Sequence, residues 1–188
     1  IIKKPNYYYM EVTVPQKNIK TWGNLKRFHE AQSKNNTIYQ KGISKPAIEA
    51  AFLDLTTPTK KGNIKKKGHW MWYVFPQIIG LGKSKMSIHY SIQNFKEGVK
   101  YLEDPLLKKN LLIMTQTILN LDKLDKIFGN TDYLKLRSSM TLFKLIAEKS
   151  NDDSIELFTK ACEITGTDIE TIKILEKDPL YIKLSKSN

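Results

Sequence analysis

Apolar residues recur along this chain at the spacing of α-helices. The clearest case is the segment 85–103, whose apolar residues follow one another at intervals of four and three: Ile88, Ile92, Phe95, Val99 and Leu102. Such a stripe is typical of a helix that lies on a core. The spacing therefore predicts one continuous helix over residues 85–103.

Capping residues predict where the other helices begin and end. Asn24 is expected to cap an early helix, and Pro46 to open a helix over residues 47–55. The pair Asp104-Pro105 supplies a cap and a first-turn proline for the next long helix. A short helix from Asp122 should stop at Gly129, and Asp132 should begin the next one. A further helix should begin at Asp152 or Asp153 and end at Gly166, and the capping-box segment 167–170 should begin the last helix.

These elements predict an all-α protein of seven or eight helices in a single compact domain. We expect an extended N-terminal arm over residues 1–21, the helical domain over 22–178, and a C-terminal tail over 179–188. Residues 33–42 are polar and should form a loop. Residues 56–68 hold five lysines and little that is apolar, which predicts a mobile surface loop. The aromatic run 69–76 should be buried, either extended or as a short helix.

Composition limits the classes of function. The chain has 188 residues, and no stretch approaches the roughly 20 apolar residues of a spanning helix, so we expect no membrane partner. The opening residues lack the pattern of a signal peptide, and Cys162 is the only cysteine, so a cytoplasmic location without disulfides is expected. Three scattered histidines give no metal-ligand spacing, and we expect neither a metal nor a cofactor.

The net charge of +12 would suit a nucleic-acid partner, but the chain is also rich in Asn and Ile, a bias expected from AT-rich coding. Only two of the 31 basic residues, Arg27 and Arg137, are arginines. Because lysine cannot reproduce the planar fork of arginine, these two positions are candidates for anion binding.

The segment Gly80-Leu81-Gly82-Lys83-Ser84 resembles the end of a phosphate-binding loop. Gln77 stands where that motif needs its first glycine, and no strand–helix alternation surrounds it, so a nucleotidase loop is rejected. Two interpretations stay open. In one, Gly80 and Gly82 let the backbone approach an anion that Lys83 and Ser84 also contact. In the other, the glycines only make the turn and Ser84 only caps the next helix.

Three further groups of residues could carry chemistry. His69 beside Trp70 and Trp72 could supply a proton donor and stacking faces, or the indoles could simply be core. Arg27 and Glu30 share a helix face, where they could bind an anion and move a proton, or form a surface ion pair. Arg137 begins a run with hydroxyls at Ser138, Ser139 and Thr141, which should face a ligand or a buried polar network.

Several blocks of the chain resemble the family called domain of unknown function 1810. They are Arg27-Phe28 with Ala31-Gln32, His69-Trp70-Met71-Trp72 with Phe75-Pro76-Gln77, Gly80-Leu81-Gly82 with Ser84, Tyr101-Leu102 with Pro105-Leu106, and Lys135-Leu136 with Ser138-Ser139-Met140-Thr141-Leu142-Phe143. The resemblance covers about residues 22–175 and implies a small helical fold without an assigned activity. Gln32 and Gln77 stand in these blocks and join the ligand-binding candidates.

A weaker, fold-level resemblance links the chain to the NADAR (YbiA-like) enzymes, and it implies chemistry at N-glycosidic bonds of compounds such as ADP-ribose. The first hypothesis is accordingly a domain that binds, and as an enzyme would hydrolyse, a nucleotide-derived anion. Glu30 and His69 would then be the catalytic residues. The second hypothesis is a non-enzymatic basic module that binds nucleic acid or another polyanion through the Lys60–Lys67 loop.

Overall fold

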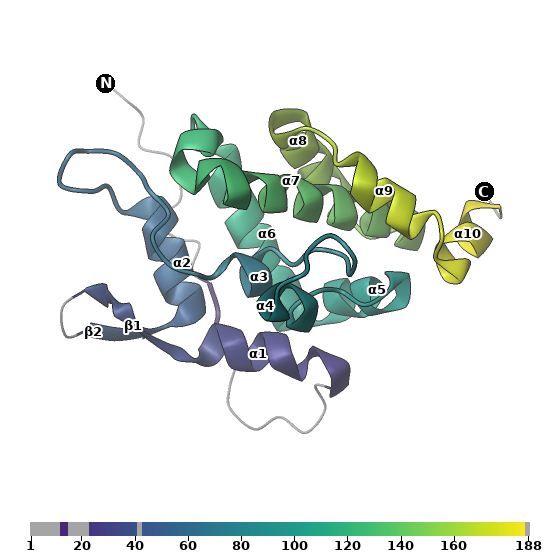
Figure 1. Ribbon diagram of the computed structural model, residues 1–188, viewed down its shortest axis with the longest axis horizontal. Helices are drawn as coiled ribbons and strands as arrows, with labels where there is room; N and C mark the ends of the chain where they lie inside the picture. Colours follow the sequence, from purple (N-terminus) through teal and green to yellow (C-terminus); the bar gives the residue numbers. More distant parts are fainter. Residues whose placement is uncertain (1–11, 15–22, 41–42, 187–188) are drawn as a thin grey trace.

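Ten α-helices form the body of the protein in the computed structural model, which describes residues 12–14, 23–40 and 43–186 (Figure 1). A short 3-10 helix, η2 (Gly23–Leu25), precedes the first of them. The helices are α1 (Lys26–Ser33), α2 (Ala47–Thr56), α3 (Met71–Val74), α4 (Lys85–His89), α5 (Phe95–Glu103), α6 (Pro105–Leu119), α7 (Leu124–Ser150), α8 (Ile155–Thr165), α9 (Ile169–Leu175) and α10 (Pro179–Ser185). The all-α prediction is confirmed.

Some of the capping signals mark real boundaries, whereas others are displaced, since α8 follows Ser154 rather than Asp152 or Asp153. Asp104 Oδ1 accepts hydrogen bonds from the backbone N–H groups of Leu106 (3.1 Å) and Leu107 (3.0 Å) at the start of α6. Gly129 has a φ of 70° and breaks α7 into two helical parts, as the expected stop at this residue requires. Asn24 is different, because the first residue before α1 is Leu25 and its side chain makes no capping hydrogen bond.

The expected helix over residues 85–103 is wrong, because the structure divides it into α4 and α5. Between them Ile92 pairs with an extended segment: its N–H donates to Gln77 O (2.8 Å), and its C=O accepts from Ile79 N (2.9 Å). Asn94 then caps α5 by accepting from Glu97 N at 2.9 Å. Ile92 is fully buried although it is not helical, so it keeps the apolar spacing through the break and periodicity alone does not reveal the break.

A β-hairpin replaces the loop expected over residues 33–42. Strand β1 (Asn35–Gln40) runs antiparallel to β2 (Ile43–Pro46), with the register Asn35–Pro46, Asn36–Lys45 and Gln40–Ile43. Figure 1 shows the hairpin projecting beside α2. Backbone pairing makes such a hairpin, so a polar sequence without an alternating apolar pattern does not predict it.

The C-terminal end of the described chain differs from the expected tail. Residues 179–188 were expected to be a tail, but α10 occupies Pro179–Ser185, and the buried Tyr181 ring packs against Phe95 at 5.6 Å between centroids. Of the arm expected over residues 1–21, only residues 12–14 belong to the described part, and they have no regular secondary structure. The rest of that arm lies outside the described residues.

Aromatic rings connect four helices through the core. Phe28 of α1 meets Tyr101 of α5 edge to face at 5.1 Å, and Tyr101 lies 5.2 Å from Phe143 of α7. Phe143 in turn stacks on Phe158 of α8 at 5.7 Å. All four side chains are fully buried, so this row of rings fixes α1, α5, α7 and α8 relative to one another.

Asp54 on α2 fastens the end of the lysine-rich segment. Its buried Oδ2 accepts from Lys67 N (3.1 Å), Gly68 N (2.9 Å) and Trp70 Nε1 (2.8 Å). Lys66 adds an ion pair with Asp132 of α7, with Nζ and Oδ2 2.7 Å apart. The C-terminal part of the segment that was expected to be mobile is therefore attached to the core at several points.

Candidate functional site

A surface hollow of about 490 Å³ gathers several predicted site residues that are far apart in the sequence. We call it the Arg137 hollow. It lies between the second part of α7, the segment from α3 to α4, and the start of α9. The predicted residues that line it are Trp72, Gln77, Gly82, Lys83, Ser84, Arg137 and Ser138.

The Arg137 side chain is half-buried and has no polar partner among the residues that the structure describes. Its Nε is shielded from solvent without a hydrogen-bond acceptor, and its guanidinium makes no hydrogen bond or ion pair with any residue of the described part. A shielded donor without an acceptor costs free energy, so such groups are normally paired. Arg137 is thus the cation in this hollow that most needs an anionic partner.

The glycine-containing loop borders the hollow but does not itself form an anion cradle. Ser84 Oγ accepts from Ser87 N (3.1 Å) and so caps α4, which has only five residues. A Cβ on Gly82 would lie 2.6 Å from Ser87 Cβ and Oγ, so glycine is required for close packing there. Gly80 has a φ of 102° and does not line the hollow. For these residues the structure fits the turn-and-cap interpretation, while the exposed Lys83 side chain remains as a second cation.

The hydroxyl run after Arg137 mostly bonds back to its own helix. Ser138 Oγ donates to Leu134 O (3.0 Å), and Thr141 Oγ1 donates to Arg137 O (2.9 Å) and accepts from Asp168 N (2.9 Å). Ser139 is fully buried, and its Oγ has no hydrogen-bond partner among the described residues. Of these hydroxyl residues, only Ser138 lines the hollow. The buried-network interpretation fits Thr141 but not Ser139.

A second hollow of about 360 Å³ adjoins the first and is lined by His69. The two share Trp72, Thr131 and Lys135. Lys135 Nζ lies 4.5 Å from the centre of the Trp72 ring and 2.8 Å from Asp132 Oδ1. His69 is exposed and does not line the Arg137 hollow.

Asp132 holds two cations at this junction. Burial alone would raise the pKa of its carboxyl, but hydrogen bonds from Lys135 and Lys66 outweigh that effect and bring the pKa below its usual value. Asp132 is therefore ionised, and it fixes the position of the lysine that covers Trp72.

Sequence reasoning missed several residues of the Arg137 hollow. Asp168 and Glu170 bring carboxylates from the start of α9, and Lys135 brings a further cation. Asp168 was interpreted only as part of the capping-box segment 167–170. In the structure it is the cap of α9 itself, because its Oδ2 accepts from Thr171 N at 3.2 Å. Lys135 stands in a block that carried the family resemblance, which was the available signal.

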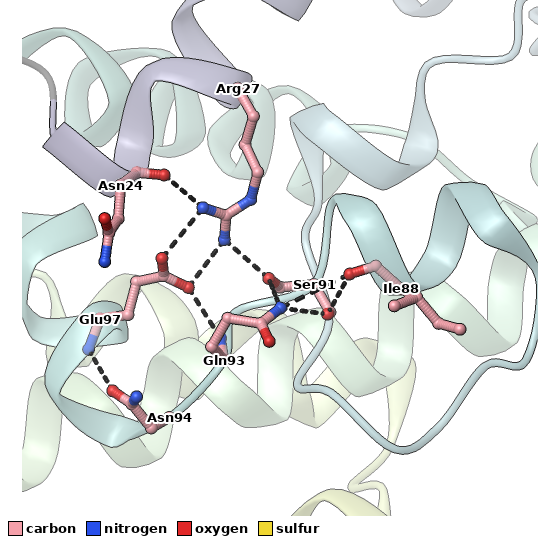
Figure 2. Close-up of polar contacts among 7 residues, drawn as sticks. All are labelled: Asn24, Arg27, Ile88, Ser91, Gln93, Asn94 and Glu97. Carbon is pink, nitrogen blue, oxygen red and sulfur yellow. Dashed lines mark hydrogen bonds and ion pairs between the residues drawn. The ribbon is translucent and has the colours of Figure 1, made fainter.

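Arg27 does not line either hollow and is part of a separate polar network (Figure 2). Its NH1 and NH2 donate to Glu97 Oε1 (3.0 Å) and Oε2 (2.7 Å), and NH2 also donates to Ser91 O at 2.8 Å. NH1 makes a further hydrogen bond to Asn24 O. These donors are engaged within the fold, so the two arginines that were candidates for anion binding do not share a hollow.

Three other predicted residues have structural positions. Glu30 is exposed and forms an ion pair with Lys26 at 3.4 Å, whereas Arg27 pairs with Glu97, so the surface pair expected between Arg27 and Glu30 is wrong. The buried Gln32 amide donates to Tyr73 O at 3.0 Å. Trp70 is fully buried and bonded to Asp54. None of the three lines either hollow.

Two other kinds of site receive no support from the described residues. Within residues 12–14, 23–40 and 43–186, no three His, Cys, Asp or Glu side chains are grouped as a metal site would need. In the same ranges no helix has the length and apolar character to cross a membrane. Cys162 is buried, and burial raises the pKa of its thiol, as expected of an unreactive core cysteine.

Comparison with known proteins gives the family. The model of the family "Protein of unknown function (DUF1810)" matches residues 23–175. The chain belongs to this family. This DUF1810 chain is also similar in structure to the conserved hypothetical protein Rv1873 from Mycobacterium tuberculosis. The TM-score is 0.66 and the sequence identity 32%, and the match covers 81% of this chain and 96% of that chain. No curated protein matches, and the expected NADAR likeness is not shown.

Proposed function

We propose that this DUF1810 chain binds a nucleotide-derived anion in the Arg137 hollow, with Arg137 as the principal contact. The observation that carries the proposal is the half-buried guanidinium without a polar partner in the described part of the chain. The other arginine of the chain shows the contrast, because Glu97, Ser91 and Asn24 accept hydrogen bonds from both terminal amino groups of Arg27. Only its Nε has no partner among the described residues. A planar guanidinium suits the paired oxygens of a phosphate or carboxylate.

The remaining lining chemistry favours a phosphorylated sugar or nucleotide over a bare anion. Lys83 and Lys135 add positive charge, and the half-buried Trp72 offers an aromatic surface for a flat ring. Asp168 and Glu170 offer acceptors for sugar hydroxyls on the α9 side of the same hollow. A ligand that combines an anionic group, hydroxyls and a ring would use all of these groups.

Hydrolysis of an N-glycosidic bond would require an acid–base group beside the bound ligand. Glu30 is outside the hollow, and His69 lies in the neighbouring one. The carboxylates positioned for such a role are Asp168 and Glu170. Binding is therefore the function proposed, and ADP-ribose and NAD are the first compounds to test for turnover.

The test is a thermal-shift and calorimetric comparison of phosphate, ribose 5-phosphate, AMP, ADP-ribose and NAD. A ligand at about 100 times its Kd should raise the free energy of unfolding by about 2.7 kcal/mol. We expect Arg137→Gln to weaken binding at least about tenfold and Arg137→Lys to weaken it less. Lys126→Gln is the matched control, since Lys126 is exposed and lines neither hollow. Equal affinity in wild type and Arg137→Gln, or no binding of any compound, would contradict the proposal.

The basic-module alternative depends on a different surface. Lys66 pairs with Asp132, but four other lysines of the Lys60–Lys67 loop are exposed: Lys60, Lys61, Lys65 and Lys67. If the chain binds a polyanion there, replacing these four by Gln should abolish binding of a DNA or RNA oligomer. Affinity should also fall steeply with salt, and Arg137→Gln should have little effect.

A further inference from the structure

Asn110 on α6 contacts the backbone of Thr13 at two points. Its Oδ1 accepts from Thr13 N at 2.7 Å, and its Nδ2 donates to Thr13 O at 2.8 Å. The side-chain amide thus pairs with the N–H and C=O of one residue, as a neighbouring strand pairs with an extended chain. The Thr13 side chain takes no part in these two hydrogen bonds.

Two further hydrogen bonds hold the Asn110 amide in position. Its Nδ2 also donates to Gln32 Oε1 at 2.8 Å, and Gln32 Nε2 donates to Tyr73 O at 3.0 Å. Both amide side chains are about 1% exposed. Contacts with α1 and α3 therefore fix the orientation of the Asn110 Oδ1 and Nδ2 atoms that bond to Thr13.

Apolar contacts flank the two hydrogen bonds. Val12 and Val14 are half-buried and pack against the hydrophobic core. In an extended segment, residues two apart lie on the same side, while the residue between them points away. We call the place where Asn110 holds the Thr13 backbone the Asn110 slot. It accepts the N–H and C=O of one residue, with an apolar residue on either side.

The slot and the segment that fills it belong to different parts of the chain. Gln32, Tyr73 and Asn110 lie inside the range 23–175 that matches the family model, whereas residues 12–14 lie outside it. Without an occupant, the buried Asn110 amide would lose both Thr13 partners, which is unfavourable for a buried polar group.

We propose that Asn110 is the centre of a binding slot for an extended peptide with an apolar–any–apolar pattern, and that Val12–Val14 occupy it as a separable intramolecular ligand. The proposal is independent of the Arg137 hollow. The contact between Thr13 and Asn110 is peptide binding within one chain.

The test uses the full chain with a protease recognition sequence in place of residues 16–21. After cleavage under native conditions, size-exclusion chromatography shows whether the N-terminal fragment stays with the body. We expect it to stay, and an excess of a synthetic peptide of residues 8–18 to displace it. Loss of the fragment at once from the wild-type sequence would overturn the proposal.

Variants in the fragment leave the helical body unchanged. Thr13→Pro removes the N–H that donates to Asn110 Oδ1, and we expect the dissociation rate of the fragment to rise about tenfold. Thr13→Val keeps both backbone groups and should behave like the wild type. Equal retention of the Thr13→Pro and Thr13→Val fragments would also overturn the proposal, because the amide pairing would then contribute nothing. Asn110→Leu, checked for folding by circular dichroism, should release the wild-type fragment.

Discussion

Arg27 and Glu97 join α1 to α5 through two hydrogen bonds of 3.0 and 2.7 Å. Both side chains are largely buried, with exposed fractions of 14% and 6%. Glu97 Oε2 also accepts from Gln93 N at 2.7 Å, and Arg27 donates to Ser91 O. The pair therefore orders the segment between α4 and α5 as well as joining the two helices (Figure 2).

Removing one partner should be costly. We expect Arg27→Ala to lower the free energy of unfolding by about 3–5 kcal/mol, because it leaves the Glu97 carboxylate buried and unpaired. Arg27→Lys should recover only part of this, since lysine cannot make the two parallel bonds. Urea unfolding measures both. The control is Lys26→Ala, which removes an exposed ion pair and should change the free energy by less than about 1 kcal/mol. Similar losses for Arg27→Ala and Lys26→Ala would contradict this role.

Gly98 sets the approach of α5 to α7. A Cβ at this position would lie 2.2 Å from Ile146 Cδ1, which belongs to a fully buried side chain. We expect Gly98→Ala to destabilise the protein by about 1–3 kcal/mol, although alanine favours helix. Ile146→Val removes the Cδ1 atom and should relieve the clash, so the two changes together should cost less than their sum in a double-mutant cycle. Strict additivity would show that α5 and α7 move apart instead.

Buried tyrosines should make the fold sensitive to alkali. Burial and the nearby Tyr90 raise the pKa of Tyr73 from 10.0 to about 12, and burial raises the pKa of Tyr101 as well. Between pH 10 and 12 the unfolded chain loses these protons while the folded chain retains them. The free energy of unfolding should then fall by up to about 1.4 kcal/mol per pH unit for each such tyrosine. Tyr73→Phe should reduce the slope, and an unchanged slope would contradict the assignment.

Asp104 should contribute to stability at the acid end. Burial would raise the pKa of its carboxyl, but hydrogen bonds from His29 and the Leu107 and Leu106 amides lower it overall. A lowered folded pKa means that the contribution is present above the unfolded value of about 3.9 and is lost as pH falls through the folded value. Asp104→Asn keeps a capping oxygen and should flatten stability between pH 5 and 2. Chemical unfolding at several pH values measures this, and parallel curves would contradict it.

The helices that sequence reasoning located were those with chemically explicit ends. The side chains of Asp104 and Pro105 and the backbone freedom of Gly129 act locally, so a local pattern reveals them. The break before α5 depends on contacts with residues 77–79 and with Arg27, which are distant in sequence. Spacing alone could not supply that information.

The candidate site was predictable to a similar extent. The chemistry of Trp72, Lys83 and Arg137 marked them as candidates, and they do meet in one hollow. Arg27 was chosen by the same reasoning, but its partner Glu97 is 70 residues away and could not be foreseen. Asp168 was missed because the capping-box segment 167–170 already accounted for it at the level of the sequence.

Asp178 determines where this protein can safely be shortened. Its Oδ1 accepts from Leu180 N (2.9 Å) and Tyr181 N (3.2 Å) at the start of α10, and its Oδ2 accepts from Phe95 N (2.8 Å) at the start of α5. One carboxylate thus begins two helices. An expression boundary drawn at residue 175, where the family match ends, would delete this carboxylate and uncover the Phe95 ring. A recombinant form that keeps residues through Ser185 retains both.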